Sequence, residues 1–200
     1  MAYPNPLVAS AMGSDKLEAL MGQLAEVSPH SQNWARVMDD LLAMLGQRLQ
    51  CDRVFLYLRC PDSQLGRVPF CWRDWSSVLL AYDREWKPEP SSLADEDPMF
   101  AAAIKAQPSI FVDDVETASP RVLNRDFERE TFGHRALIHA HLCSGQKLWG
   151  ILQACLFDAP RDWSQSDRHL IEQAVTGLTP LILDYVQAHH PNAQSLRDNP

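Results

Sequence analysis

The sequence has no run of basic residues, and acidic residues outnumber basic ones. There are 18 Lys and Arg against 26 Asp and Glu, so the formal net charge is −8 at pH 7. Neutralisation of phosphates by Lys and Arg provides most of the affinity of proteins for nucleic acids. This charge balance therefore argues against DNA, RNA and anionic membranes as partners.

Long hydrophobic runs are also missing. Charge, Pro or Gly interrupts every apolar segment before it reaches the roughly 20 residues that cross a bilayer. Residues 1–14 contain neither the basic nor the apolar region of a signal peptide. The sequence thus predicts no membrane insertion and a cytoplasmic location.

The cysteines form no Cys-x-x-Cys motif. There are five of them, an odd number at irregular spacings, and four stand beside residues with a strand pattern. These features argue against a disulfide framework and favour buried free thiols. The five are Cys51, Cys60, Cys71, Cys143 and Cys155.

What the sequence does contain is enough apolar material for one sizeable core. It has 200 residues, of which 46% are hydrophobic, and this length favours a single domain. We expect a disordered lead over residues 1–13, one domain over 14–188 and a polar tail over 189–200.

Three helical patterns are apparent. Ser14 is a candidate cap for a first helix, and Ser31 for a second one that continues to Leu49. A third helix begins after residues 164–167, whose spacing resembles a capping box, and Pro180 is expected to kink it. A shorter helix is expected from Asp97-Pro98 to Ala106, and another in the charged connection 116–134.

Strand patterns separate the helices. A Gly in the connection 144–146 favours a tight hairpin between the last two strands, whereas residues 83–90 are expected to be a surface loop because they contain two prolines and no period. This order predicts an α+β domain with an antiparallel sheet and helices layered on one face. The expected strands are 53–59, 68–72, 109–112, 136–143 and 147–157.

Two motifs near the end of the sheet carry a family resemblance. Residues 145–152 read Gly-Gln-Lys-Leu-Trp-Gly-Ile-Leu, and residues 160–163 read Pro-Arg-Asp-Trp. They resemble the G-x-L-W-G-L-L and P-R-x-W signature of the GAF domains of phytochromes and cyanobacteriochromes, and Arg135-Ala136 and 112–115 also resemble segments of those domains. The resemblance covers about residues 31–187 and implies a GAF fold with paired N- and C-terminal helices.

The same comparison shows where this chain departs from the bilin-binding relatives. Arg121 follows Ser119-Pro120 where many of them have the Cys that forms a thioether to the tetrapyrrole. Met99 occupies the Cys position of their D-x-C-F motif, and Cys155 stands where they often have a pocket His. The resemblance therefore implies a GAF domain that attaches no bilin covalently, while non-covalent binding of a tetrapyrrole remains an alternative.

Candidate ligand contacts come from the expected pocket region. Tryptophans there can stack on a planar ligand, and arginines can clamp a carboxylate, although neighbouring acidic residues favour a self-paired surface helix. His139 and His141 share one face of a strand, but no third ligand at suitable spacing accompanies them, so we expect no metal. The candidate pocket residues are Trp72, Trp75, Met99, Phe100, Asp114, Arg121, Arg135, His139, His141 and Cys155.

The functional expectation is a stand-alone, non-catalytic sensory or regulatory domain. It would act in trans through a protein partner or a small ligand, and the resemblance suggests a photosynthetic cyanobacterium as its source. The alternatives are a photosensor with a non-covalent bilin and a thiol enzyme of the methionine sulfoxide reductase type, although Cys143 and Cys155 lack an adjacent cation that would activate them.

A homodimer is expected through the first and last helices. Leu17, Leu20 and Leu24 form a stripe on the first helix that would otherwise face water or fold back onto the chain.

Overall fold

The fold is built on one six-stranded antiparallel sheet. A computed structural model describes residues 6–75 and 77–189. The strand order is β3-β2-β1-β6-β5-β4, and every neighbouring pair is antiparallel. The strands are β1 (Arg53–Cys60), β2 (Leu65–Arg73), β3 (Asp83–Pro88), β4 (Ile110–Val112), β5 (Ala136–Ser144) and β6 (Lys147–Leu156).

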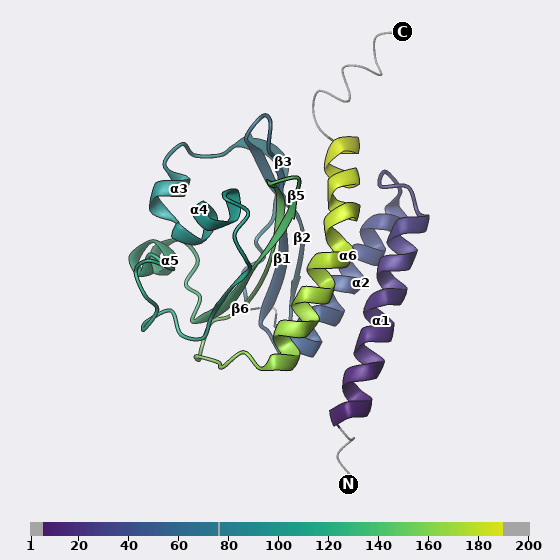
Figure 1. The fold of residues 1–200 in the computed structure, drawn as a ribbon, viewed down its shortest axis with the longest axis horizontal. Helices are drawn as coiled ribbons and strands as arrows, with labels where there is room; N and C mark the ends of the chain where they lie inside the picture. The colour runs from purple at the N-terminus through teal and green to yellow at the C-terminus, as the bar shows by residue number, and fades with distance from the viewer. Residues whose placement is uncertain (1–5, 76, 190–200) are drawn as a thin grey trace.

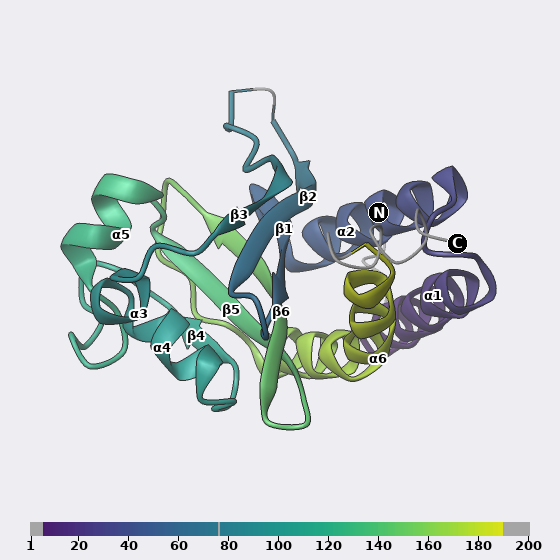
Figure 2. The same ribbon diagram turned by 90° about the horizontal axis from the view of Figure 1, so that it is seen from above.

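Helices cover both faces of this sheet. The long helices α2 (Gln32–Leu49) and α6 (Gln165–His189) pack on one face, and α1 (Pro6–Glu26) packs on their outer side (Figure 1). The short helices α3 (Leu93–Glu96), α4 (Pro98–Ile104) and α5 (Arg125–Thr131) lie over the other face (Figures 1 and 2). The expected α+β class with an antiparallel sheet is confirmed; of the helices that were expected on one face, the long ones lie there and the short ones lie on the other.

Local sequence signals define several helix ends. The Ser31 side chain accepts a hydrogen bond from the Trp34 backbone N–H at 3.1 Å, which caps α2. Before α6, the Ser164 backbone N–H donates to Asp167 Oδ2 at 2.9 Å, and the Asp167 backbone N–H donates to Ser164 Oγ at 3.2 Å. This reciprocal pair is the predicted capping box.

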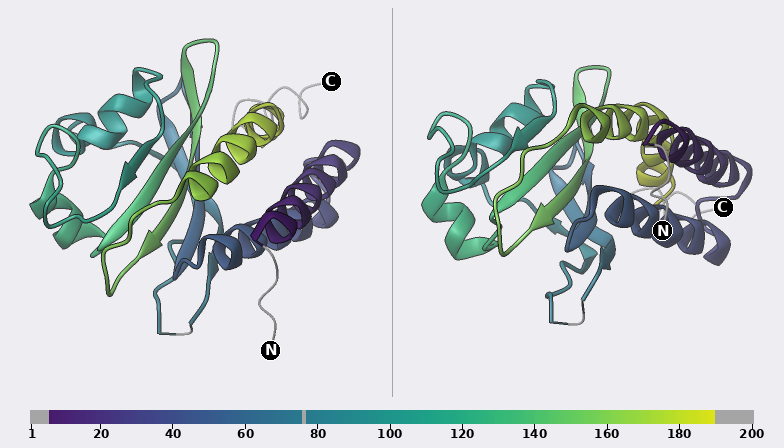
Figure 3. Two further views of the ribbon diagram at one scale, coloured as in Figure 1. Left: turned by 60° about the horizontal axis from the view of Figure 1, so that its bottom comes forward. Right: turned by 90° about the horizontal axis from the view of Figure 1, so that it is seen from below.

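The main core lies between the sheet and the long helices. Alternation along β1 and β6 directs Val54, Leu56, Leu152 and Ala154 toward α2 and α6, where they are buried in one cluster. Figure 3 shows the long helices forming a separate layer on this side of the sheet. The opposite sheet face is left for a second set of side chains, described below.

The first helix differs from its prediction. It begins at Pro6, so residues 6–13 are helical and Ser14 lies inside the helix instead of capping it. The expectation of a disordered lead is therefore wrong for residues 6–13, and residues 1–5 lie outside the described part. At the other end, His189 is the last residue of α6, and the rest of the expected tail, residues 190–200, also lies outside it.

The segment 83–90 was expected to be a loop, and this is a second error. Its first six residues form the strand β3, which pairs with β2 at one edge of the sheet. Charged residues and a terminal proline are tolerated there because an edge strand has one side without a partner.

The leucine stripe of α1 is buried within the chain. Leu17 and Leu24 are each 1% exposed and Leu20 is 8% exposed, because they pack against the other long helices. The stripe has folded back, so it offers no surface for a second subunit. The homodimer itself stays a proposal.

Two expectations about the chain as a whole can be compared with the structure. No described helix combines the length and apolar character needed to cross a membrane. All five cysteines are free thiols, four buried and Cys143 half-buried, as the sequence predicted.

Candidate functional site

The candidate site is a small pocket on the sheet face opposite the long helices. Its floor consists of two rows of side chains in register across β1, β6 and β5: one row contains Phe55, Gln153 and His139, and the next contains Tyr57 and Ile151. The cavity has a volume of about 140 Å³. Its lining residues are Phe55, Tyr57, Val68, Leu93, Asp97, Met99, Phe100, Glu128, Phe132, His139, Ile151 and Gln153.

Helix α4 closes the pocket from above. Asp97 caps this helix, as the sequence predicted, by accepting a hydrogen bond from the Met99 backbone N–H at 2.8 Å. Met99 and Phe100 are both buried. Burial raises the pKa of Asp97 to about 6, although the backbone N–H groups of Phe100 and Met99 oppose the rise, and nearby Glu128 adds to it.

Aromatic rings form much of the wall. Tyr57 and Phe100 meet edge to face with ring centroids 6.2 Å apart, and Phe55 and Phe132 line the same cavity. Such walls bury apolar or cationic groups well.

The Tyr57 hydroxyl is engaged outside the cavity. It donates to Glu89 Oε1 at 2.5 Å, and Arg59 holds the same carboxylate through Nε and Nη2 at 2.8 and 3.0 Å. Burial and the Glu89 charge raise the pKa of Tyr57. The phenol therefore stays protonated. Its O–H donates a hydrogen bond to Glu89 and not to a molecule in the pocket.

His139 and His141 form a directed hydrogen-bond chain. His141 Nδ1 lies 2.7 Å from the Gln107 carbonyl oxygen, so this nitrogen must carry the hydrogen. Burial lowers the pKa of both imidazoles, well below the ordinary value for His139. His141 Nε2 is then an acceptor, and His139 Nδ1 donates to it at 2.9 Å. In the neutral ring of His139 the remaining nitrogen, Nε2, is an acceptor.

A second polar cluster lies next to the pocket. Arg53 Nη2 is 2.7 Å from His134 Nε2, and the other ring nitrogen of His134 contacts Glu128 Oε1. All three side chains are buried, Glu128 with only 1% of its surface exposed. The Glu128 carboxylate, which lines the cavity, is thus matched by basic groups behind it. Within the part of the chain that the structure describes, no Lys, Arg or His lowers the pKa of Asp97 in this way.

The structure brings three of the predicted site residues together in the pocket wall: Met99, Phe100 and His139. His141 lies behind His139 and supports it. Their role in ligand binding remains a prediction.

Other predicted site residues lie elsewhere. Trp72 packs against Gly46 of α2 on the opposite face of the sheet. Trp75 is 63% exposed in the β2–β3 connection, and Arg121 is exposed in the loop before α5. Strand alternation explains Trp72: it pairs with Val54, a residue of the helix-facing core.

Three further candidates are also outside the pocket. Arg135 Nε lies 2.9 Å from Asp114 Oδ1, so these two side chains satisfy each other at the surface. Cys155 is fully buried in a small cluster with Leu137 and does not line the cavity.

Sequence reasoning missed several pocket residues. Asp97 was treated only as a helix cap, Glu128 was taken for part of a solvated charged helix, and Gln153 was not singled out. The strand alternation that pairs Gln153 with His139 was available from the sequence, but nothing local marks Glu128, whose burial depends on tertiary packing with His134.

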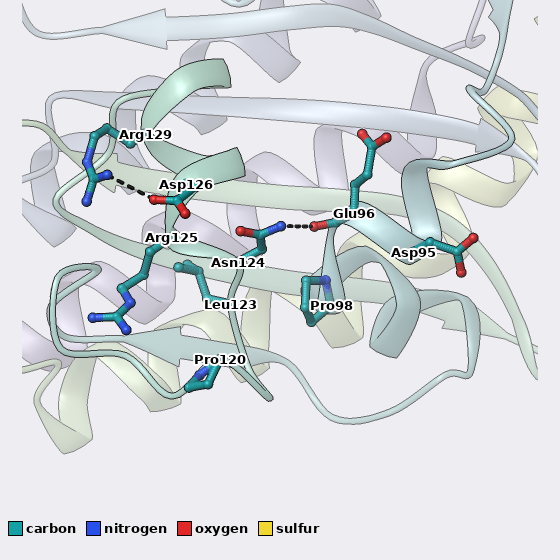
Figure 4. A pocket seen from close by; sticks show the side chains of 9 residues that line it. All are labelled: Asp95, Glu96, Pro98, Pro120, Leu123, Asn124, Arg125, Asp126 and Arg129. Carbon is teal, nitrogen blue, oxygen red and sulfur yellow. Dashed lines mark hydrogen bonds and ion pairs between the residues drawn. The ribbon is translucent and has the colours of Figure 1, made fainter.

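A surface depression between α3 and α5 is shown in Figure 4. It is lined by charged side chains together with Asn124, Pro98, Pro120 and Leu123, and it has a volume of about 390 Å³. Asn124 Nδ2 donates to the Glu96 backbone oxygen at 3.0 Å, and Arg129 pairs with Asp126 at 3.1 Å. This ion pair is exposed, as expected of a solvated surface.

A third depression lies beneath the connection between β2 and β3. It has a volume of about 720 Å³ and is lined by residues 77–81 and Trp75, together with Phe132 and Phe157. Figure 2 shows this connection extending away from the sheet. Leu79 is 80% exposed, although Arg53 Nη1 donates to its carbonyl at 2.8 Å and so holds the backbone.

Comparison with known proteins identifies the fold. The family model of the GAF domain matches residues 33–178. No curated protein sequence matches the chain.

Three solved structures illustrate the likeness. The phycoerythrobilin-bound GAF domain of a cyanobacterial phytochrome aligns with a TM-score of 0.67 and 16% identity over 89% of this chain and 97% of that one. Free methionine-R-sulfoxide reductase from Neisseria meningitidis, in complex with its substrate, aligns with a TM-score of 0.61 and 15% identity over 94% of this chain and 96% of that one. The chromophore-binding domain of a bacteriophytochrome from R. palustris aligns with a TM-score of 0.64 and 16% identity. The alignment covers 87% of this chain but 61% of that one. At these identities the likeness concerns the fold alone.

Proposed function

Since the chain belongs to the GAF domain family, a sensory and regulatory fold, we propose that it is a non-catalytic sensor that binds a small organic ligand between its sheet and α4. One observation carries the proposal: buried polar side chains and aromatic rings from separate elements converge on one cavity. Convergent polar groups in a mostly apolar pocket are typical of small-molecule sites.

The size of the cavity limits the ligand. At about 140 Å³ it is smaller than the roughly 300–1,000 Å³ of drug-sized sites. A protein cavity of about 150 Å³ holds one benzene molecule. The pocket in this form therefore suits a ligand of one ring or less, and four pyrrole rings do not fit it. This observation favours a small-molecule sensor over a photosensor that holds a bilin non-covalently.

The thiols do not support an enzyme. Burial raises the pKa of Cys143 and of Cys71, which disfavours the reactive thiolate. Cys155 has no exposed surface. A thiol-based reductase would need an accessible sulfur in the pocket wall, and no cysteine lines this cavity.

The proposal can be tested by ligand-observed NMR with a library of one-ring and smaller molecules. Binding to the wild type should disappear in Val68→Trp, because Val68 is half-buried in the pocket wall and a larger side chain there occupies the cavity. Leu79→Ser is the matched control, since Leu79 lies in the other depression. Binding that is unchanged in Val68→Trp would place the ligand elsewhere and contradict the proposal.

A second role, protein binding, is supported by the β2–β3 connection. Trp75, Leu79, Leu80 and Tyr82 are at least 40% exposed, and clusters of exposed apolar side chains mark interaction sites in many proteins. We propose that this connection, not the leucine stripe of α1, contacts the partner, and that a second copy of the chain is the simplest partner.

Sedimentation velocity over a range of concentrations tests this second role. The wild type should associate, and Leu79→Ser with Leu80→Ser should weaken the association. Val68→Trp, which alters the pocket, should leave it unchanged. A wild type that stays monomeric would rule out the self-association.

A further inference from the structure

The polar groups of the pocket are almost all hydrogen-bond acceptors. The Tyr57 O–H already donates its hydrogen bond to Glu89, and the directed chain through His141 leaves Nε2 of His139 as an acceptor. Asp97 and Glu128 line the same cavity with carboxylates. Gln153 is the one lining residue with a side-chain amide, and its Nε2 lies 3.4 Å from His134 Nδ1.

His139 requires a hydrogen-bond donor from the ligand. It is 3% exposed and lines the cavity. Its side-chain hydrogen bond within the described residues uses Nδ1, which leaves Nε2 for a molecule in the cavity. A ligand that donates a hydrogen bond to this cavity-lining nitrogen would complete the hydrogen bonding of the imidazole.

Asp97 adds a requirement for charge. Its oxygen accepts from the backbone of α4, but no Lys, Arg or His among the described residues compensates its charge. Glu128, by contrast, already faces His134. A positive group in the cavity would therefore gain most from Asp97, and the aromatic rings that line the cavity would favour the same group.

We propose that the ligand of this pocket is a small primary ammonium compound, with its N–H groups at His139 and Asp97 and a compact apolar body against the aromatic wall. This inference rests on the proposed function, since it names the chemical class of molecule for that same pocket. The ammonium group supplies both the donors and the charge that the lining lacks. An anion would instead meet two carboxylates and a lone pair.

The test compares probes of nearly equal size and different charge. Isobutylammonium, isobutanol and isobutyrate share the same small apolar body, and their binding to the full chain can be measured by ligand-observed NMR titration. Isobutylammonium should bind at least about tenfold more tightly than isobutanol, the difference expected of a charge-assisted hydrogen bond. Isobutyrate should not bind.

Asp97→Asn is the informative variant, because Asn is as good a helix cap as Asp and removes only the charge. It should weaken isobutylammonium binding about tenfold or more and leave isobutanol binding nearly unchanged. Asp95→Asn is the matched control, because Asp95 carries the same charge outside this cavity. Far-ultraviolet circular dichroism confirms that each variant is folded.

The outcomes separate the two proposals. If isobutanol or isobutyrate binds as tightly as the ammonium compound, and Val68→Trp abolishes that binding, the pocket is a ligand site but the ammonium class is wrong. If no probe and no library molecule binds the wild type, both proposals fail. If ammonium binding survives Asp97→Asn unchanged, Asp97 does not recognise the cation and the inference is overturned.

Discussion

Asp97→Asn should also change how the stability of the protein depends on pH. Burial raises the pKa of Asp97 from an ordinary value of 3.8 to about 6. The folded protein therefore binds a proton more tightly than the unfolded chain, and the stability contributed by this group falls as pH rises from about 4 to about 6. Above that window the buried charge is a net cost.

The size of this effect follows from the pKa difference. About two pH units between 3.8 and about 6 correspond to about 3 kcal/mol, at 1.36 kcal/mol for each unit. Asparagine has no charge to bury and caps the helix equally well. Relative to the wild type, Asp97→Asn should thus gain about 2.5 kcal/mol of unfolding free energy between pH 4 and pH 7.5, slightly less than the full value because the unfolded carboxyl is already partly ionised at pH 4.

Urea denaturation of both proteins across this pH range measures the difference directly. Taking the difference between the two proteins cancels every other titrating group that the substitution leaves undisturbed. Asp95→Asn should show no comparable trend, because Asp95 is exposed. A wild-type minus variant difference that stays constant from pH 4 to pH 7.5 would refute the reasoning, since it would mean that Asp97 titrates alike in the folded and unfolded states.

Three further predictions concern other parts of the chain. Gly46→Ala should destabilise the protein by about 1–3 kcal/mol in urea denaturation, because the added methyl group would overlap the Trp72 ring. At Gly22 an added methyl group meets no atom, so Gly22→Ala should stabilise α1 by up to about 1 kcal/mol. Equal effects of the two substitutions would contradict this packing. Replacing Cys143 and Cys155 together by Ser should lower stability and leave probe binding intact, and sulfoxide reduction that depends on either cysteine would show that the protein is an enzyme. Expression in cells that make phycocyanobilin should give a band without zinc-enhanced fluorescence after denaturing electrophoresis; a fluorescent band would show covalent attachment.

Much of the fold could be predicted because its signals are local. The hairpin between β5 and β6 has Gly145 and Gln146 in the left-handed region, with φ of 57° and 64°, and a glycine at such a turn is visible in the sequence. The caps at Ser31 and Asp97 depend on residues only two or three positions away.

The errors arose where structure depends on distant partners. β3 has no strand pattern of its own and exists because β2 offers it an edge. The error at α1 is of another kind, because Asn5-Pro6, a residue pair typical of helix starts, stands at its beginning and was overlooked.

The candidate site was predicted only in part for the same reason. Met99 and Phe100 follow a recognisable cap, and His139 shows the alternation of a strand. The acceptor character of His139, however, is set by the carbonyl of Gln107, which lies 34 positions from His141 in the chain. No pattern along the sequence predicts that contact.

The hydrogen-bond chain from Gln107 to His139 ends on a main-chain oxygen, and this has a consequence for the mutational tolerance of the pocket. A carbonyl oxygen cannot donate, so the direction of the chain cannot reverse while both imidazoles stay neutral. Every amino acid has this oxygen, so substitutions at position 107 that keep the backbone in place should leave the ligand preference of the pocket unchanged. Replacement of His141, by contrast, removes the acceptor for His139 Nδ1. The tautomer of His139 that presents a lone pair on Nε2 would then no longer be enforced.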